Sequence, residues 1–218
     1  MKAAIFDMDG TLVDSMYYWR TVSLEFLRTK GIEPPRELCD RAYLMSVRDA
    51  PELFRQYYEF PYTEEEYNDT VNSIMFEHYR RDVGLKPYAA EYLEKMRAQG
   101  VVCALATATW RPVVIPLLEK LGVLRYFYSG GREYMVCRDE LGMGKGSDEY
   151  YPLLCKKFGF KPEDCVMYED ALYSMRTAKR AGLGVWAIAD PTAQANLPEI
   201  RRLANRYVSG WKELVDEN

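Results

Sequence analysis

The sequence predicts an α/β fold, a doubly wound parallel sheet that carries an inserted all-α helical cap domain. After residue 84, short apolar runs alternate with segments of helical periodicity, a pattern typical of βαβ units. Between residues 15 and 84, apolar and aromatic residues recur at helical spacing, and no convincing strand is found. Acidic, hydroxyl and lysine side chains also follow several of the apolar runs, at the strand ends where such sheets bind ligands.

The core is expected to begin with a buried strand over residues 2–6, which ends at Asp7. Asp9 and Gly10 then turn the chain. Asp7 and Asp9 are one residue apart, and two carboxylates at that separation repel each other. Their presence therefore predicts either a cation between them or a carboxyl group that is held for chemistry.

The helical block is predicted to be a domain inserted after the first strand. Glycine and proline residues separate its helices. Thr63, with Glu66 three residues later, marks the start of a third or fourth helix. We therefore expect residues 15–84 to form the cap, and residues 1–14 and 85–218 to form the core.

Helices and strands are expected to alternate in the rest of the core. The helices are predicted at 88–99, 111–121, 148–158 and 171–181, and the strands at 101–106, 125–128, 165–168 and 184–189. Glycines close the last three helices. The alternation implies a parallel sheet covered on both faces by helices. Residues 191–218 show no recognisable chemistry.

Composition excludes several classes of function. The net charge of -4 offers no basic excess for a nucleic-acid backbone, so no nucleic-acid partner is expected. The 5 cysteines form no Cys-x-x-Cys pair and the chain has one histidine, so no zinc site is expected. Scattered cysteines and the lack of a signal peptide or long apolar run predict a cytoplasmic protein with no membrane partner. The oligomeric state stays open, and a monomer is compatible with the sequence.

Chemically active side chains are expected to converge at one edge of the sheet, where the parallel strands end. These residues are Asp7 and Asp9 after the first strand, Thr107 after the second, Lys145 in the loop after the third, and Glu169 and Asp170 after the fourth. Convergent carboxylates that protein cations cannot all neutralise require a hard divalent metal, and oxygen ligands favour Mg²⁺.

At these positions the chain resembles the haloacid-dehalogenase-superfamily phosphatases, in the branch that has a helical cap and includes β-phosphoglucomutase-like enzymes. The first family motif, Asp-x-Asp-Gly-Thr/Val, reads "DMDGTL" here. The family's strand-end hydroxyl corresponds to Thr107, its lysine to Lys145, and its acidic pair to Glu169-Asp170. Order and spacing match from Met1 to about Pro191. The resemblance implies a Rossmann-like core and a phosphohydrolase.

The resemblance also implies the role of each residue. Asp7 would be the nucleophile that forms an aspartyl-phosphate, and Asp9 the general acid and base. Mg²⁺ would be held by Asp7, the backbone carbonyl of Asp9, and Asp170, with Glu169 supporting it directly or through water. Lys145 and Thr107 would stabilise the transferring phosphoryl group. The remaining residues expected to bind substrate are Gly10, Thr11, Ala108, Arg48 and Trp19.

The chain departs from the family pattern at two places. The loop "KGSDEY" lacks both prolines of the usual Lys-Pro-x-Pro-Asp. Ser174 stands where the family often has a glycine after the acidic pair, and there it is expected to crowd the helix packing near the site. Glu169 could equally be a helix N-terminal acid favoured by the dipole, and Arg48 could be a surface residue.

Three functions are compatible with these residues. The leading one is Mg²⁺-dependent hydrolysis of a small phosphorylated metabolite. A sugar phosphomutase is the alternative, but mutases of this branch carry a cap histidine and a cap lysine. Trp19 falls at the place of that histidine, and Lys30 is the only lysine of the block, so neither the histidine nor the lysine of the mutases has a match here. The third is a non-catalytic binding protein, which the intact acids disfavour. The tyrosine-rich cap could stack on a substrate or form the cap's own core.

Overall fold

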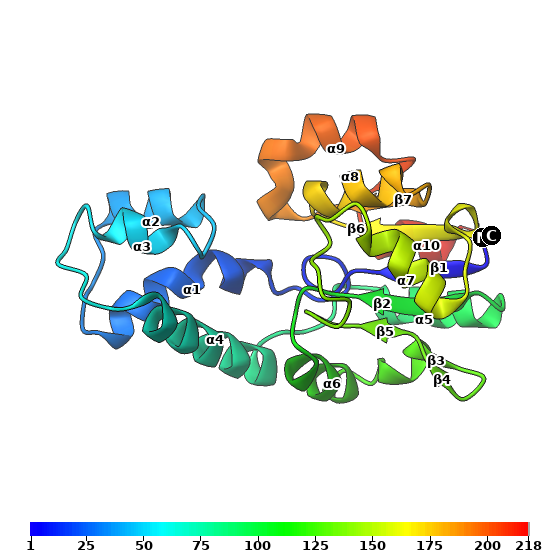
Figure 1. Cartoon of the computed structure of the whole chain (residues 1–218), viewed down its shortest axis with the longest axis horizontal. Coiled ribbons are helices and arrows are strands. Elements are labelled where there is room, and N and C mark those ends of the chain that lie inside the picture. Colours follow the sequence, from blue (N-terminus) through cyan, green and yellow to red (C-terminus); the bar gives the residue numbers. More distant parts are fainter. Residues whose placement is uncertain (218) are drawn as a thin grey trace. The chain divides into compact units, whose positions relative to one another are not determined.

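A computed structural model describes residues 1–217 of the chain. The chain forms two compact units, Met1–Asp14 with Gly84–Asn218 and Ser15–Val83. We refer to them as the core unit and the helical unit and describe each by itself (Figure 1). Gly84, which the sequence assigns to the insertion, belongs to the core unit.

The core unit is built on a parallel sheet. Among the described residues, six strands pair in the order β5-β2-β1-β6-β7-β8, and every pair is parallel. The strands are β1 (Ala3–Phe6), β2 (Val102–Ala106), β5 (Met135–Val136), β6 (Cys165–Glu169), β7 (Gly184–Ile188) and β8 (Arg206–Val208). The predicted doubly wound parallel sheet is therefore confirmed.

Helices cover both faces of this sheet. They are α5 (Ala89–Ala98), α6 (Arg111–Lys120), α7 (Tyr150–Phe158), α8 (Leu172–Arg180), α9 (Leu197–Leu203) and α10 (Trp211–Asp216), with short 3-10 turns at η2 (Pro162–Asp164) and η3 (Pro191–Asn196). Successive strand residues point to opposite faces. Phe6 and Tyr168 stack on one face, against Tyr92 and Trp211. On the other face, residues such as Ile5 pack with α7 and α8.

The predicted strand over 125–128 is wrong. Residues Leu124–Phe127 form a 3-10 helix, η1, and the third strand of the sheet is β5 instead. A separate antiparallel hairpin joins β3 (Tyr128–Ser129) and β4 (Arg132–Glu133). Its turn uses two glycines in the left-handed region, a hairpin signal that the apolar pattern of the preceding residues obscures.

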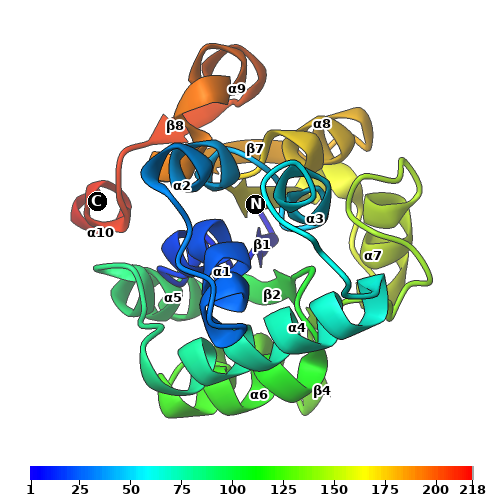
Figure 2. The same cartoon turned by 90° about the vertical axis from the view of Figure 1, so that its left-hand side faces the viewer.

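The helical unit contains α1 (Met16–Thr29), α2 (Arg36–Tyr43), α3 (Ala50–Phe54) and α4 (Glu64–Arg81). Helices α1 and α4 lie side by side (Figure 2). The predicted capping box is confirmed, because the Thr63 hydroxyl accepts the Glu66 amide at 3.1 Å and the Glu66 carboxylate accepts the Thr63 amide at 2.8 Å. Among residues 1–217 no helix is both long and apolar enough to cross a membrane.

Aromatic side chains fill the interior of the helical unit. Phe26 contacts Phe60, Tyr62 and Tyr67 with ring centroids 4.9 to 5.7 Å apart. Part of the tyrosine-rich block therefore forms the core of this unit, which was one of the two interpretations of the sequence.

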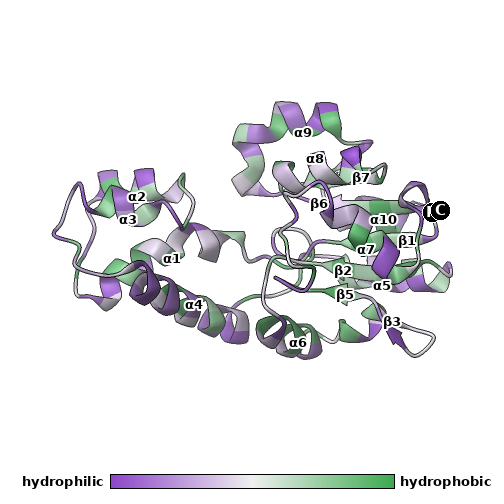
Figure 3. Ribbon diagram, in the orientation of Figure 1, coloured by the Kyte–Doolittle hydropathy of each residue, from purple (hydrophilic) through white to green (hydrophobic). Residues whose placement is uncertain are grey.

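Figure 3 shows hydrophobic residues gathered in the strands of the sheet and hydrophilic residues along α4.

His78 links two acidic side chains within the helical unit. Its Nε2 lies 2.8 Å from Glu25 Oε2, and its Nδ1 lies 2.8 Å from Asp82 Oδ2. Burial lowers the pKa of His78, but these two carboxylates together raise it above its ordinary value of 6.5. The charged imidazole therefore stabilises the fold at low pH, and this contribution is lost as pH rises through the raised pKa of the folded state.

We expect the stability difference between the wild type and His78→Gln to shrink as pH rises. The measurement is urea unfolding of both proteins at a series of pH values that rises from about pH 5.5, below the ordinary pKa of histidine. Because both proteins share every other titrating group, the difference isolates His78. A difference that grows with pH would show that the imidazole is neutral in the folded protein.

Candidate active site

Three buried carboxylates meet at the carboxyl edge of the sheet. Asp7 follows β1, Glu169 ends β6, and Asp170 follows it. Strands β1 and β6 pair with Phe6 opposite Tyr168, so the parallel register itself brings Asp7 beside Glu169. One ligand oxygen from each of the three acids lies within 4.8 Å of the others. The predicted convergence of acids is thus present in the structure.

Lys145 lies among these acids. Its Nζ donates to Asp7 Oδ1 at 2.5 Å, to Glu169 Oε2 at 2.8 Å and to the Ala106 carbonyl at 3.3 Å. The ammonium group has three N–H donors, and these three acceptors use all of them. The Thr177 hydroxyl on α8 donates to the Lys145 carbonyl at 2.5 Å, which holds the loop "GMGKGS" against that helix.

The charges of this cluster do not balance. Burial, and then the carboxylate of Glu169, raises the pKa of Asp7 and also that of Asp170. Burial lowers the pKa of Lys145, but Asp7 and Glu169 raise it well above its ordinary value. Three acids against one ammonium leave an excess of negative charge. An oxygen-only donor set with this excess fits a hard divalent cation.

The turn after β1 supports Asp170. Gly10 is buried and has a φ of 76°, a left-handed conformation that favours glycine. Thr11 is fully buried, and its hydroxyl donates to Asp170 Oδ1 at 3.2 Å. The Thr11 carbonyl accepts the indole N–H of Trp211 at 3.0 Å. The structure therefore places the Thr11 side chain against an acid of the cluster.

Two threonines after β2 organise the neighbouring loop. The Thr107 hydroxyl accepts the Thr109 amide at 3.0 Å, which leaves its own proton to donate. The Thr109 hydroxyl donates to Asp9 Oδ2 at 2.7 Å. Ala108, between them, is exposed. Thr109 was missed in the sequence, although it stands in the same "LATAT" run as Thr107.

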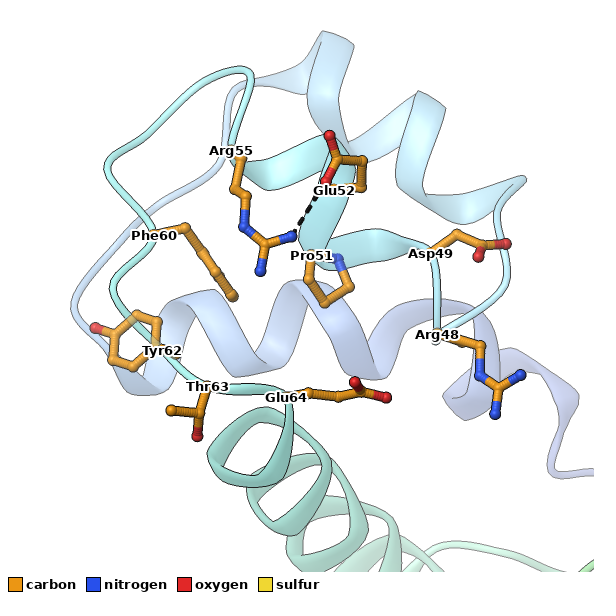
Figure 4. A pocket seen from close by; sticks show the side chains of 9 residues that line it. All are labelled: Arg48, Asp49, Pro51, Glu52, Arg55, Phe60, Tyr62, Thr63 and Glu64. Atoms are coloured by element: carbon orange, nitrogen blue, oxygen red, sulfur yellow. Dashed lines mark hydrogen bonds and ion pairs between the residues drawn. The ribbon is translucent and has the colours of Figure 1, made fainter.

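Trp19 and Arg48 belong to the helical unit. The Trp19 indole donates to the Tyr79 hydroxyl at 2.9 Å, so its polar atom has a partner within that unit. Arg48 is exposed and lines a pocket of about 320 Å³ in which Arg55 pairs with Glu52 at 3.1 Å (Figure 4). Charges of both signs line this pocket, so its electrostatics do not select an anion.

Two further buried polar residues, Asp190 and Ser174, lie near the cluster, and only Asp190 gave no signal in the sequence. Asp190, after β7, pairs with Lys86 at 2.8 Å and contributes to the raised pKa of Asp170. Ser174 was expected to crowd α8, but it is fully buried and donates to Glu169 Oε2 at 2.5 Å. It also lies 2.5 Å from the Tyr151 hydroxyl.

Comparison with known proteins agrees with this geometry. Residues 4–188 match the family model of haloacid dehalogenase-like hydrolases. The chain is 26% identical to the phosphorylated carbohydrates phosphatase of Thermotoga maritima over 183 residues, which cover 84% of this chain and 82% of that protein. It is 28% identical to hexitol phosphatase B of Escherichia coli O157:H7 over 217 residues, covering 98% and 94%.

Solved structures share the fold. The crystal structure of CbbY from Rhodobacter sphaeroides in complex with phosphate superposes with a TM-score of 0.73 at 22% identity, covering 98% of this chain and 96% of that one. At this identity the match shows the fold. The family model covers most of the chain, and the two curated relatives named above are phosphatases. The chain is therefore a phosphatase of the haloacid dehalogenase-like hydrolase family.

Proposed function

We propose that the protein is a Mg²⁺-dependent phosphohydrolase that acts on a small phosphomonoester through an aspartyl-phosphate intermediate. The observation that carries the proposal is the buried group of Asp7, Lys145 and Asp170 at the carboxyl edge of the sheet. The substrates named for two relatives, phosphorylated carbohydrates and a hexitol phosphate, support a small phosphorylated metabolite. The free cysteines support a cytoplasmic location.

Asp7 attacks phosphorus in the first step. Its carboxylate forms a bond to phosphorus as the bond to the leaving alkoxide oxygen breaks, which gives the aspartyl-phosphate. Lys145 holds Asp7 Oδ1 at 2.5 Å and places positive charge where negative charge gathers on the phosphoryl oxygens. Thr107 retains a proton to donate to one of these oxygens.

Asp9 moves protons in both steps. It protonates the leaving alcohol oxygen, and the resulting carboxylate then takes a proton from the water that attacks the aspartyl-phosphate. Inorganic phosphate leaves, and both acids return to their starting states. The hydroxyl of Thr109 holds Asp9 Oδ2 at 2.7 Å and so limits the rotation of the carboxyl group that must meet both oxygens.

Asp7, Asp170 and the backbone carbonyl of Asp9 would hold the magnesium ion. When bound, the ion offsets the charge of the transferring phosphoryl group. The chain's own contribution is the arrangement of the ligands. Thr11 orients the Asp170 carboxylate through a hydrogen bond of 3.2 Å, and burial of the acids excludes the water that would otherwise solvate them.

We expect EDTA to abolish phosphate release and added Mg²⁺ to restore it. The reason is that the acids of the cluster repel one another and the substrate unless a cation offsets their charge. The measurement is phosphate release from a panel of phosphorylated metabolites, with and without the chelator. Isomerisation of a sugar phosphate primed by a bisphosphate, without net phosphate release, would identify a mutase. Hydrolysis that is indifferent to chelation would contradict the metal's role.

A further inference from the structure

Glu169 is surrounded by hydrogen-bond donors. Its Oε1 accepts the backbone amides of Asp170 and Ala171 at 3.2 and 3.1 Å. Its Oε2 accepts Lys145 Nζ at 2.8 Å and the Ser174 hydroxyl at 2.5 Å. A carboxylate has about four lone-pair positions, and these four donors occupy them. Glu169 is fully buried, so the arrangement is shielded from exchange with bulk water.

The contact between Ser174 and Tyr151 has a defined direction. Ser174 has one hydroxyl proton, which it donates to Glu169. The hydrogen bond of 2.5 Å between Tyr151 and Ser174 must therefore run from the tyrosine to the serine. Burial raises the pKa of Tyr151 well above its ordinary value, so the phenol keeps the proton that it donates. Tyr151, Ser174 and Glu169 thus form a directed chain that begins on α7 and ends in the site.

The carboxylates of the other two acids of the cluster accept fewer hydrogen bonds than that of Glu169. Among residues 1–217, the structure shows one side-chain donor to the carboxylate of Asp7, which is Lys145, and one to that of Asp170, which is Thr11. Both carboxylates therefore retain lone pairs that can enter a coordination shell. One oxygen of each of the three acids lies within 4.8 Å of the others, yet the acids differ in the number of lone pairs that they can offer a cation.

We propose that Ser174 and Tyr151 are positioning residues that hold Glu169 outside the metal's coordination shell, as the fixed counter-ion of Lys145. The proposal rests on the phosphatase mechanism above and excludes the direct metal ligation that the sequence left open for Glu169. In this arrangement Glu169 holds the ammonium group of Lys145 in place between the acids, while Asp7 and Asp170 bind the cation.

Two variants remove the donors without changing charge. Ser174→Ala deletes the hydroxyl that binds Glu169, and Tyr151→Phe deletes the hydroxyl that orients Ser174. The matched control is Tyr150→Phe, the same change at the adjacent buried position. The Tyr150 hydroxyl has no hydrogen-bond partner among the described residues, so this variant is expected to keep its activity and melt at an unchanged or higher temperature.

The first measurement is isothermal titration of each protein with Mg²⁺ alone. We expect Ser174→Ala and Tyr151→Phe to bind Mg²⁺ with a Kd within about threefold of the wild type, or more tightly, because Glu169 is not a ligand. Asp170→Asn is the positive control and should weaken binding by at least about tenfold. A similar weakening in Ser174→Ala would overturn the proposal, since it would show that Glu169 binds the metal directly.

The second measurement separates kcat from KM. In Ser174→Ala we expect kcat to fall by about tenfold or more with KM nearly unchanged, because Lys145 loses its fixed counter-ion at the reacting group. Tyr151→Phe should show a smaller fall in the same direction. An unchanged kcat in Ser174→Ala would also overturn the proposal.

The two measurements distinguish this proposal from the function on which it rests. The Mg²⁺ titration uses no substrate, so its outcome stands if no phosphomonoester is hydrolysed. A wild type that hydrolyses nothing would refute the proposed function while the titration still decides whether Glu169 is a ligand. A wild type that hydrolyses phosphomonoesters, with weakened Mg²⁺ binding in Ser174→Ala, would refute only the positioning role.

Discussion

Replacing Asp7 with asparagine is expected to abolish turnover while the protein still folds. An amide cannot form the acyl phosphate, so we expect phosphate release to fall by at least about 10⁴-fold. Asparagine has nearly the same volume as aspartate, and Lys145 keeps its contacts with Glu169 and the Ala106 carbonyl. Removing one of three crowded charges also relieves repulsion, so the melting temperature in EDTA should stay the same or rise.

Phosphate release and circular dichroism test this expectation together. Asp14→Asn is the matched control, because it makes the same change at an exposed residue further along the same segment. It should leave both activity and melting temperature close to those of the wild type. Turnover of Asp7→Asn within tenfold of the wild type would remove Asp7 as the nucleophile, provided that the fold is intact.

Lys145→Met should damage both stability and activity. The change leaves Asp7 and Glu169 buried without the ammonium group that bridges them at 2.5 and 2.8 Å. Loss of one partner from a buried ion pair costs about 3–5 kcal/mol of unfolding free energy. Turnover should fall by about 10²- to 10³-fold, because the phosphoryl oxygens lose a fixed positive charge.

Urea unfolding with EDTA and with Mg²⁺ measures the stability effect. Mg²⁺ should restore part of the lost stability in Lys145→Met, because the cation offsets the charge of Asp7, one of the two carboxylates that lose the ammonium group. Lys2→Met is the matched control. Lys2 pairs with Asp164 at the similar distance of 2.8 Å, but its side chain is 74% exposed, and such pairs contribute little. Equal losses in the two variants would mean that burial does not control the contribution of Lys145.

The sequence was sufficient to predict which acids and which lysine converge. Asp7, Lys145 and Asp170 lie in strand ends and a loop whose order along the chain is readable from apolar runs. Parallel pairing then places the carboxyl ends of the strands at one edge of the sheet, and this does not depend on how the side chains pack. For the same reason the fold class was predictable, since alternating strands and helices admit few topologies.

Contacts that depend on side-chain direction were not predictable. The partners of Ser174 and Asp9 are determined by which way a helix face or a loop turns, and no spacing rule encodes that direction. Residues 206–208 gave no strand signal, yet they form β8, because pairing with β7 outweighs their weak local preference. The hairpin at 128–133 was missed because neighbouring aromatic residues resembled a strand of the main sheet.

The contact between Trp211 and the Thr11 carbonyl has a consequence for how the protein is made. It joins residues that are 200 positions apart in the chain, and β1 also pairs with β6, which is synthesised much later. The loop that carries Asp7, the proposed nucleophile, therefore leaves the ribosome long before β6 and Trp211, which complete its contacts, are synthesised. Contacts of such long range form late and slowly. The nascent chain must thus carry an incomplete candidate active site through most of its translation.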